Sequence, residues 1–238
     1  MNKLKICAIS DLHGILPLIE ESADVLLIAG DVIPLSIQFN KLKSHEWFIT
    51  VFADWVKNLP VDKVIMVAGN HDAHLESISN VNLQLIHFAC ENKLVYLCNE
   101  TTNYICKNGL TWKIFGTPYC HIFGSWPFMR SESYMEEKFK EIPDKVDIII
   151  SHDPPFCANN VDAILERPRH SGQYENVGNK PLKTRLSEID YKLLVCGHIH
   201  SGNHDLHHDN FWKCVNVSIL NENYALAYPP FYTEIEHG

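Results

Sequence analysis

Residues Lys63 to Asp72 read KVIMVAGNHD, an apolar run followed by Gly69, Asn70, His71 and Asp72. An apolar run of this length that is closed by a glycine predicts a buried strand ending where the chain turns. Polar residues placed just after such a turn lie at the carboxyl end of a strand, the edge where open α/β sheets bind ligands. This stretch therefore predicts an α/β fold with its site at the strand ends.

The same arrangement occurs at four further places along the chain. Runs this uniformly apolar are typical of strands that are covered on both faces. Carboxylate and imidazole side chains that collect at one sheet edge indicate a metal centre. The four runs, each with the side chains that follow it, are Leu4 to Ile9 with Asp11 and His13, Val25 to Ala29 with Asp31, Asp147 to Ile150 with His152, and Leu193 to Cys196 with His198 and His200.

These residue types predict phosphoester hydrolysis. Two divalent ions roughly 3.5 to 4 Å apart need a carboxylate that contacts both, and Asp31 is our candidate for that bridge. Such a pair of ions activates a water and neutralises charge on phosphoryl oxygens. His71 is the candidate general acid for the leaving oxygen, with Asp72 or a backbone carbonyl orienting its ring.

The five motifs together resemble those of the calcineurin-like metallophosphoesterases, which contain Asp-x-His, Gly-Asp, Gly-Asn-His-Asp/Glu, Gly/Ser/Thr-His and Gly-His-x-His in this order. The resemblance covers nearly the whole chain and implies a four-layer α/β/β/α sandwich of two mixed sheets flanked by helices. It places the family's general acid at His71. It also implies that Asp11, His13, Asp31 and His200 hold one metal, and that Asp31, Asn70, His152 and His198 hold the other.

Finer features bear on the branch of that family. Residues Ser151 to Pro155 and Asn216 to Ser218 most resemble the small class III cyclic-nucleotide-phosphodiesterase-like branch, that of the brain metallophosphoesterase-domain proteins. Val-Ile-Pro-Leu follows Asp31, where Ser/Thr protein phosphatases have Asp-Arg-Gly, which disfavours that role. Purple acid phosphatases have a tyrosinate ligand a few residues after the aspartate that corresponds to Asp31. No tyrosine occurs between Asp31 and Tyr96, which disfavours a purple iron centre.

We expect a phosphodiesterase with a small substrate, and a cyclic nucleotide is the specific candidate. A phosphomonoesterase acting on a nucleotide or sugar phosphate is the alternative enzyme. A non-catalytic scaffold of the same fold is the alternative outside catalysis, disfavoured because all the ligands and His71 are present. The expected cofactors are two divalent ions, with manganese favoured and iron, zinc, nickel, cobalt or magnesium as alternatives.

Composition limits the other possibilities. The 238 residues, 46% of them hydrophobic, can bury one substantial core, and no linker-like tract divides them, so we expect a single domain over residues 1–238. A formal charge of −9, from 20 basic and 29 acidic residues, argues against binding long nucleic acid. We find neither a signal peptide nor an apolar run long enough for a membrane span, and we expect a cytoplasmic protein without a membrane partner. The oligomeric state stays open.

Several local elements are also predicted. Apolar residues at helical spacing predict a helix from about Lys41 to Asn58, and a second is expected over Leu83 to Asn92. The Asn108-Gly109 pair predicts a hairpin turn. We expect closing strands over Phe211 to Val217 and Ala225 to Ile235.

Two loops are expected to govern substrate choice. Residues Pro118 to Arg130 carry Tyr119 and His121, although packing of the loop is the competing explanation for its aromatic side chains. Residues Pro154 to Pro181 follow His152 directly, and a phosphate-binding role there competes with simple solvation of charge. The candidates in this second loop are Arg167, Arg169 and His170.

Overall fold

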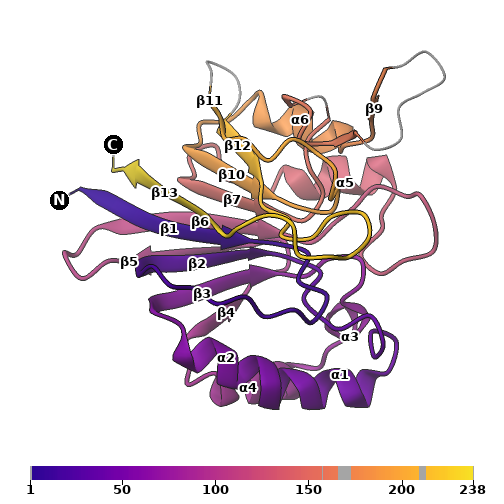
Figure 1. Ribbon diagram of the computed structural model, residues 1–238. Helices are drawn as coiled ribbons and strands as arrows, with labels where there is room; N and C mark the ends of the chain where they lie inside the picture. Colours follow the sequence, from indigo (N-terminus) through magenta and orange to yellow (C-terminus); the bar gives the residue numbers. More distant parts are fainter. Residues whose placement is uncertain (1, 157, 166–172, 209–212, 238) are drawn as a thin grey trace.

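Two large mixed sheets lie face to face in the middle of the molecule, with helices on both outer sides (Figure 1). The computed structural model describes residues 2–156, 158–165, 173–208 and 213–237. The predicted α/β/β/α sandwich of two mixed sheets is confirmed.

The first sheet has the strand order β13-β1-β2-β3-β4. Strands β1 to β4 run parallel, while β13 pairs antiparallel with β1. Because β1, β2 and β3 are parallel, the residues that follow them emerge at one edge of the sheet. The bounds are β1 (Lys3–Ile9), β2 (Ala23–Ala29), β3 (Val61–Val67), β4 (Leu94–Tyr96) and β13 (Phe231–Glu236).

The second sheet has the order β11-β12-β10-β7-β6-β5. Its four central strands, β12, β10, β7 and β6, are parallel, and an antiparallel strand closes each edge. A small pair, β8 (Ala163–Ile164) and β9 (Glu175–Asn176), stands apart from both large sheets. The bounds of the six strands are β5 (Glu100–Ile105), β6 (Thr111–Thr117), β7 (Ile148–Ser151), β10 (Leu193–Cys196), β11 (His207–His208) and β12 (Lys213–Asn216).

Alternation along the strands explains why both faces of each sheet are covered. In β1, Leu4 and Ile6 pack in the core between the sheets, whereas Cys7 and Ile9 pack on the helical side. Trp112 of β6 is fully buried in the core between the sheets. Strands with two apolar faces fit only where both faces are covered.

The helices form the two outer layers. A continuous helical segment, made of α1 (Lys41–Trp47), a π-helical turn η1 (Phe48–Phe52) and α2 (Ala53–Asn58), has the bounds that were predicted. Together with α4 it covers the first sheet, while α5 and α6 cover the second (Figure 1). The remaining helices are α3 (Ala73–Glu76), α4 (Asn80–Ala89), α5 (Glu132–Phe139) and α6 (Lys180–Leu186).

Two element boundaries differ from the prediction. Helix α4 lies three residues earlier than expected, because the Ser79 side chain caps its start and Asn92 is left-handed beyond its end. Strand β13 begins at Phe231 and not at Ala225, since Pro229 and Pro230 have no N–H to donate to a ladder. The predicted hairpin at Asn108-Gly109 is confirmed, with β5 and β6 pairing antiparallel on either side.

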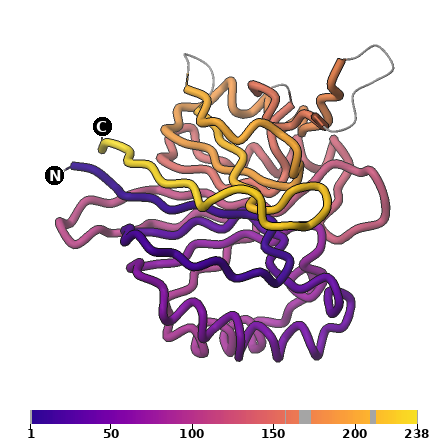
Figure 2. The backbone as a smooth tube through the Cα atoms, viewed as in Figure 1, coloured from indigo at the N-terminus to yellow at the C-terminus, as the bar shows by residue number. Residues whose placement is uncertain are grey.

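The two ends of the described chain lie side by side (Figure 2), since β13 pairs with β1. Within the described ranges, none of the helices is both long enough and apolar enough to cross a membrane.

Candidate metal centre

The ends of five parallel strands bring the predicted ligands together between the two sheets. Strands β1, β2 and β3 lead to Asp11, His13, Asp31 and Asn70, and strands β7 and β10 lead to His152, His198 and His200. Two groups made wholly of these predicted ligands have ligand atoms that all lie within 4.8 Å of one another. They are Asp11 with His13 and His200, and Asp11 with Asp31 and His152.

The backbone at the site is bent into conformations that side chains disfavour. Asp11, His13, Asp31 and His198 all have positive φ, between 43° and 69°. Such a residue costs about 1 to 3 kcal/mol and persists only where the surroundings hold it. Backbone hydrogen bonds provide that hold, because the N–H of His13 donates to the Asp31 carbonyl at 2.9 Å. A Cβ at Gly69 would overlap the Asp31 carboxylate, which explains the glycine there.

Asp31 lies at the centre of the cluster. Its Oδ2 is 3.4 Å from His152 Nε2, 3.8 Å from His13 Nε2 and 4.0 Å from His71 Nε2. Its Oδ1 accepts the backbone N–H of His71 at 2.7 Å. Burial raises the pKa of Asp31, but the charge and hydrogen bond of His152, together with the charges of His13 and His71, outweigh burial and hold that pKa well below its usual range. One carboxylate thus faces imidazoles from both sheets, as a bridging ligand must.

Backbone carbonyls set the orientation of two imidazole rings. His152 Nδ1 donates to the Ala29 carbonyl at 2.7 Å, and His200 Nδ1 donates to the Asn221 carbonyl at 2.9 Å. A carbonyl only accepts, so each ring turns Nε2 toward the site, the usual arrangement of metal-binding histidines. His152 Nε2 then meets Asn70 Oδ1 at 3.0 Å, another acceptor. Burial lowers the pKa of His152, yet Asp31 raises it to about 10, and a divalent ion would replace that proton.

His13 tests whether a cation fits. The residue is 8% exposed, and neither of its ring nitrogens has a hydrogen-bond partner among the described residues. An unsatisfied buried polar group costs about 1 to 3 kcal/mol. Burial also lowers the pKa of His13 to about 4, so the ring is a neutral imidazole, the form that binds metals. The donor set around His13 therefore fits a bound cation.

Asp11 is held by groups that the motifs did not reveal. Its Oδ2 accepts from Ser218 Oγ at 2.6 Å and from the backbone N–H of His198 at 2.9 Å. Ser218 follows β12, so it reaches the site by the same strand-end geometry as the ligands. Its position directly after an apolar strand is the signal that would have found it.

His71 has a different partner from the one suggested by sequence. Its Nδ1 lies 2.6 Å from Gln38 Oε1, and its ring packs on Trp126 with centroids 4.7 Å apart. Asp72 turns inward and accepts the backbone N–H groups of Val32, Ile33 and Gly69. Burial, followed by the charge of Asp31, raises the pKa of Asp72 to about 7. Asp72 does not orient the His71 ring, because the three backbone donors hold its carboxylate within the fold.

A cavity of about 470 Å³ opens beside the cluster. His71 and His121 contribute to its polar lining, and Phe123, Trp126 and Tyr224 provide aromatic walls. His121 Nδ1 donates to the buried Asp153 at 2.9 Å. Burial lowers the pKa of His121, but Asp153 outweighs it and raises the pKa overall.

Other substrate candidates from the sequence are placed elsewhere. Tyr119 is buried away from the cavity lining, where its hydroxyl accepts from Tyr134 at 3.3 Å and its ring meets Arg130. Packing thus explains Tyr119, as the competing interpretation held. Arg167, Arg169 and His170 lie outside the described residues.

Comparisons with known proteins identify the family. The model of the calcineurin-like phosphoesterase family matches residues 4–202. The human Metallophosphoesterase domain-containing protein 1 is 27% identical over 95% of this chain and 69% of its own length. A UPF0046 protein of Caenorhabditis elegans is 28% identical over 98% of this chain and 82% of its own.

A solved crystal structure with 14% identity superposes with a TM-score of 0.61 over 90% of each chain, a likeness of fold. The family implies divalent metal ions and phosphoester hydrolysis, and the His and Asp groups of this site are candidates to hold the ions. On the family match, which spans most of its length, this chain belongs to the calcineurin-like phosphoesterases.

Proposed function

We propose that this protein is a metal-dependent phosphodiesterase that acts on a small phosphodiester. The observation that carries the proposal is the lining of the cavity beside the cluster. Among the described lining residues there is no Lys or Arg, while Phe123, Trp126 and Tyr224 form aromatic walls. A phosphomonoester brings two negative charges, which proteins usually meet with arginine or lysine. A diester brings one charge and a second ester group, which apolar walls suit.

Two ions complete the site in this proposal. Bound ions would supply an activated water and neutralise the phosphoryl charge. Manganese is the first ion to test, with the other divalent transition ions and magnesium as alternatives. One ion would be held by Asp11, His13, Asp31 and His200, and the other by Asp31, Asn70, His152 and His198.

His71 is proposed as the general acid for the leaving oxygen. Its Nδ1 is tied to Gln38 Oε1, which leaves Nε2, 4.0 Å from Asp31 Oδ2, to face the substrate. Trp126 packs on the same ring and limits its rotation. A fixed imidazole at hydrogen-bond reach of the leaving group is the geometry that general acid catalysis needs.

His121, which also lines the cavity, is proposed to contact the phosphoryl group. Its ring lies 6.2 Å from that of His198, between centroids, and Asp153 fixes its orientation through Nδ1. Asp153 is held in turn by Asn179 Nδ2 at 3.0 Å. A histidine anchored by a buried carboxylate has one nitrogen left for a ligand, and here that nitrogen is Nε2.

Cyclic nucleotides are the first candidates to screen as the natural substrate. Each is a small phosphodiester with a flat base, and bases stack on aromatic side chains for about 1 to 3 kcal/mol each. Phe123 and Trp126 are the candidates for that stacking.

The test starts from metal-free protein to which Mn²⁺ is returned. The values of kcat/KM for bis-p-nitrophenyl phosphate and p-nitrophenyl phosphate are then compared. Faster cleavage of the diester is the expected result. A preference for the monoester would favour a phosphatase instead, and no metal-dependent activity on either compound would favour a scaffold role.

A further inference from the structure

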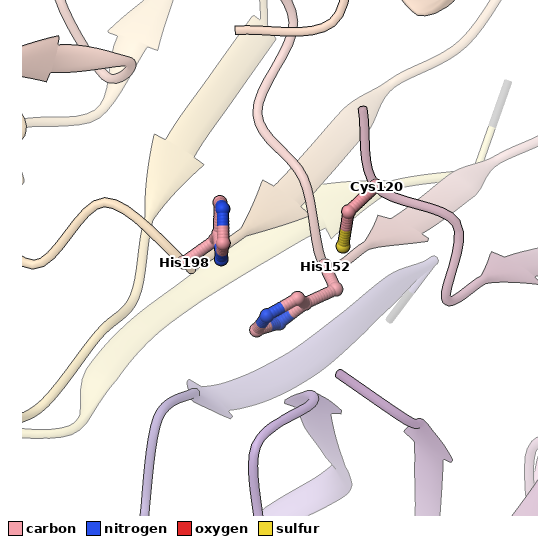
Figure 3. Close-up of side chains that lie close together, drawn as sticks. All are labelled: Cys120, His152 and His198. Atoms are coloured by element: carbon pink, nitrogen blue, oxygen red, sulfur yellow. The ribbon is translucent and has the colours of Figure 1, made fainter. Parts of the chain in front are cut away.

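A fully buried thiol lies beside the proposed metal centre. Cys120 faces His152 and His198 (Figure 3), and its Sγ lies within 4.8 Å of a ring nitrogen of each. None of the five motifs includes this cysteine. Its thiol donates a hydrogen bond to the Pro118 carbonyl at 3.4 Å, and S–H is a weak donor.

The sheet topology places Cys120 by the same rule as the motif ligands. Strands β6, β7 and β10 are adjacent and parallel, so the chain leaves all three at one edge. Cys120 comes three residues after β6, His152 one residue after β7, and His198 two residues after β10. The three side chains therefore come from three neighbouring strand ends and meet in the space between them (Figure 3).

The loop fixes the backbone of Cys120 on both sides. Its N–H donates to the Phe128 carbonyl at 3.1 Å, and its carbonyl accepts from the N–H of Arg130 at 2.9 Å. The backbone that carries the sulfur is thus held in place before any ion binds, which lowers the entropy lost when a ligand is immobilised.

Simple packing is the alternative explanation, since buried cysteines often act as small apolar side chains. Cys90 is such a case, because it lies in the apolar core where helix α4 ends. Cys120 differs, because two imidazoles that are proposed to bind metal lie next to its sulfur. An imidazole pair with a cysteine is a donor set that suits zinc, cobalt or iron.

We propose that Cys120 supplies a sulfur ligand to the ion that His152 and His198 hold. This proposal rests on the metal centre of the proposed function. Zinc lies about 2.3 Å from sulfur and about 2.0 to 2.1 Å from nitrogen, so a sulfur and a nitrogen that share one ion at an angle of about 90° to 110° lie about 3.1 to 3.6 Å apart. The Cys120 sulfur, now within 4.8 Å of both ring nitrogens, needs to approach each of them by about 1.2 to 1.7 Å at most. On binding, the thiol proton leaves to solvent and the thiolate coordinates the ion.

One consequence is a preference among metals. Thiolate ligands select softer ions, whereas Mg²⁺ and Mn²⁺ favour oxygen ligands. The site at Cys120 is expected to prefer Zn²⁺ or Co²⁺, and the site at Asp11, His13 and His200 to be less selective.

Cobalt reports sulfur ligation without any assay of activity. Metal-free protein is titrated with Co²⁺, and absorption is followed in the visible, where bound cobalt absorbs, and in the near ultraviolet, where thiolate-to-cobalt charge transfer absorbs. Native protein is expected to show both bands. Cys120→Ser is expected to keep the visible bands and lose the charge-transfer band. Its Zn²⁺ affinity should fall by at least the ~10-fold that loss of an outer-sphere partner costs.

Two control variants distinguish ligation by Cys120 from ligation by other cysteines. Cys90→Ser introduces the same change at a buried site in the helix layer, and Cys98→Ser removes a thiol that is only partly buried. Both are expected to keep the charge-transfer band. Native protein that binds Co²⁺ without that band would overturn the assignment of Cys120 and leave the metal centre standing. Native protein that binds no Co²⁺ would overturn the metal centre as well.

Discussion

Replacing Asp72 tests what its carboxylate does in the fold. It accepts the backbone N–H groups of Val32, Ile33 and Gly69 at 2.9 to 3.0 Å. Leaving a buried donor unsatisfied costs about 1 to 3 kcal/mol, so Asp72→Ala, which orphans three donors, should cost about 3 to 9 kcal/mol. A typical domain has about 5 to 15 kcal/mol of stability in total. We therefore expect this variant to be largely unfolded.

Asp72→Asn is the sharper version of the experiment. The remaining oxygen still accepts from Val32 and Ile33, but the new amide group points a donor at the N–H of Gly69. One lost acceptor predicts a decrease of about 1 to 3 kcal/mol in the free energy of unfolding. Urea unfolding of the metal-free protein measures it by linear extrapolation. Metal affinity should fall too, because Val32 follows Asp31 and Gly69 precedes Asn70.

The control is Asp144→Asn, a change to a carboxylate whose side chain is 85% exposed beside Arg185. It should alter the free energy of unfolding by no more than about 0.5 kcal/mol. The contrary result is that Asp72→Asn has the same urea midpoint as the native protein but slowly hydrolyses diesters with poor leaving groups. Asp72 would then act on His71, and its proposed role of joining the loop at Val32 and Ile33 to the loop at Gly69 would be refuted.

Three other outcomes are expected. His71→Gln should keep its metals and lose about 100-fold to 10,000-fold in rate on diesters with alkyl leaving groups, with a smaller loss on nitrophenyl diesters, measured as kcat/KM; equal losses would speak against proton donation. Asp31→Asn should lower the metal content found by elemental analysis and nearly abolish turnover, and a variant that retains both would exclude the bridge. Burial, then the charges of His45 and Lys41, lowers the pKa of His74 from 6.5. The neutral His74 ring therefore contributes fully to the free energy of unfolding above about pH 6.5, and this contribution is lost as pH falls below that value. In the native protein the urea midpoint should decline between about pH 7 and pH 5, and His74→Gln should make that decline less steep.

The positions of the ligands were predictable because two local signals coincide. An apolar run such as Leu193 to Cys196 predicts a strand, and the polar residues after it must emerge at the strand end. Parallel pairing then brings strand ends together, which needs no knowledge of side-chain contacts. Asp11, Asp31 and His152 meet for this reason.

The partners of these residues were not predictable in the same way. Gln38 lies 33 positions before His71 in a segment without strand or helix, and only the tertiary fold brings the two together. The side-chain direction of Asp72 depends on the turn at Gly69, which spacing does not report. Tyr119 and Cys120 are neighbours in one loop, yet the first packs inward against Tyr134 and the second reaches the site.

The candidate metal centre combines backbone strain and buried polar groups, both of which oppose folding. Four residues of the candidate metal centre, among them Asp11 and Asp31, have left-handed backbones that cost about 1 to 3 kcal/mol each. His13 adds a buried ring without a hydrogen-bond partner among the described residues. Two sheets with apolar residues on both faces supply the stability that holds this geometry in place. A cation that satisfied His13 and Asp31 together would relieve the electrostatic part of the cost, so metal affinity and fold stability are expected to be coupled. The rigid frame then matters to catalysis, because ligands already held in position need no rearrangement when substrate arrives.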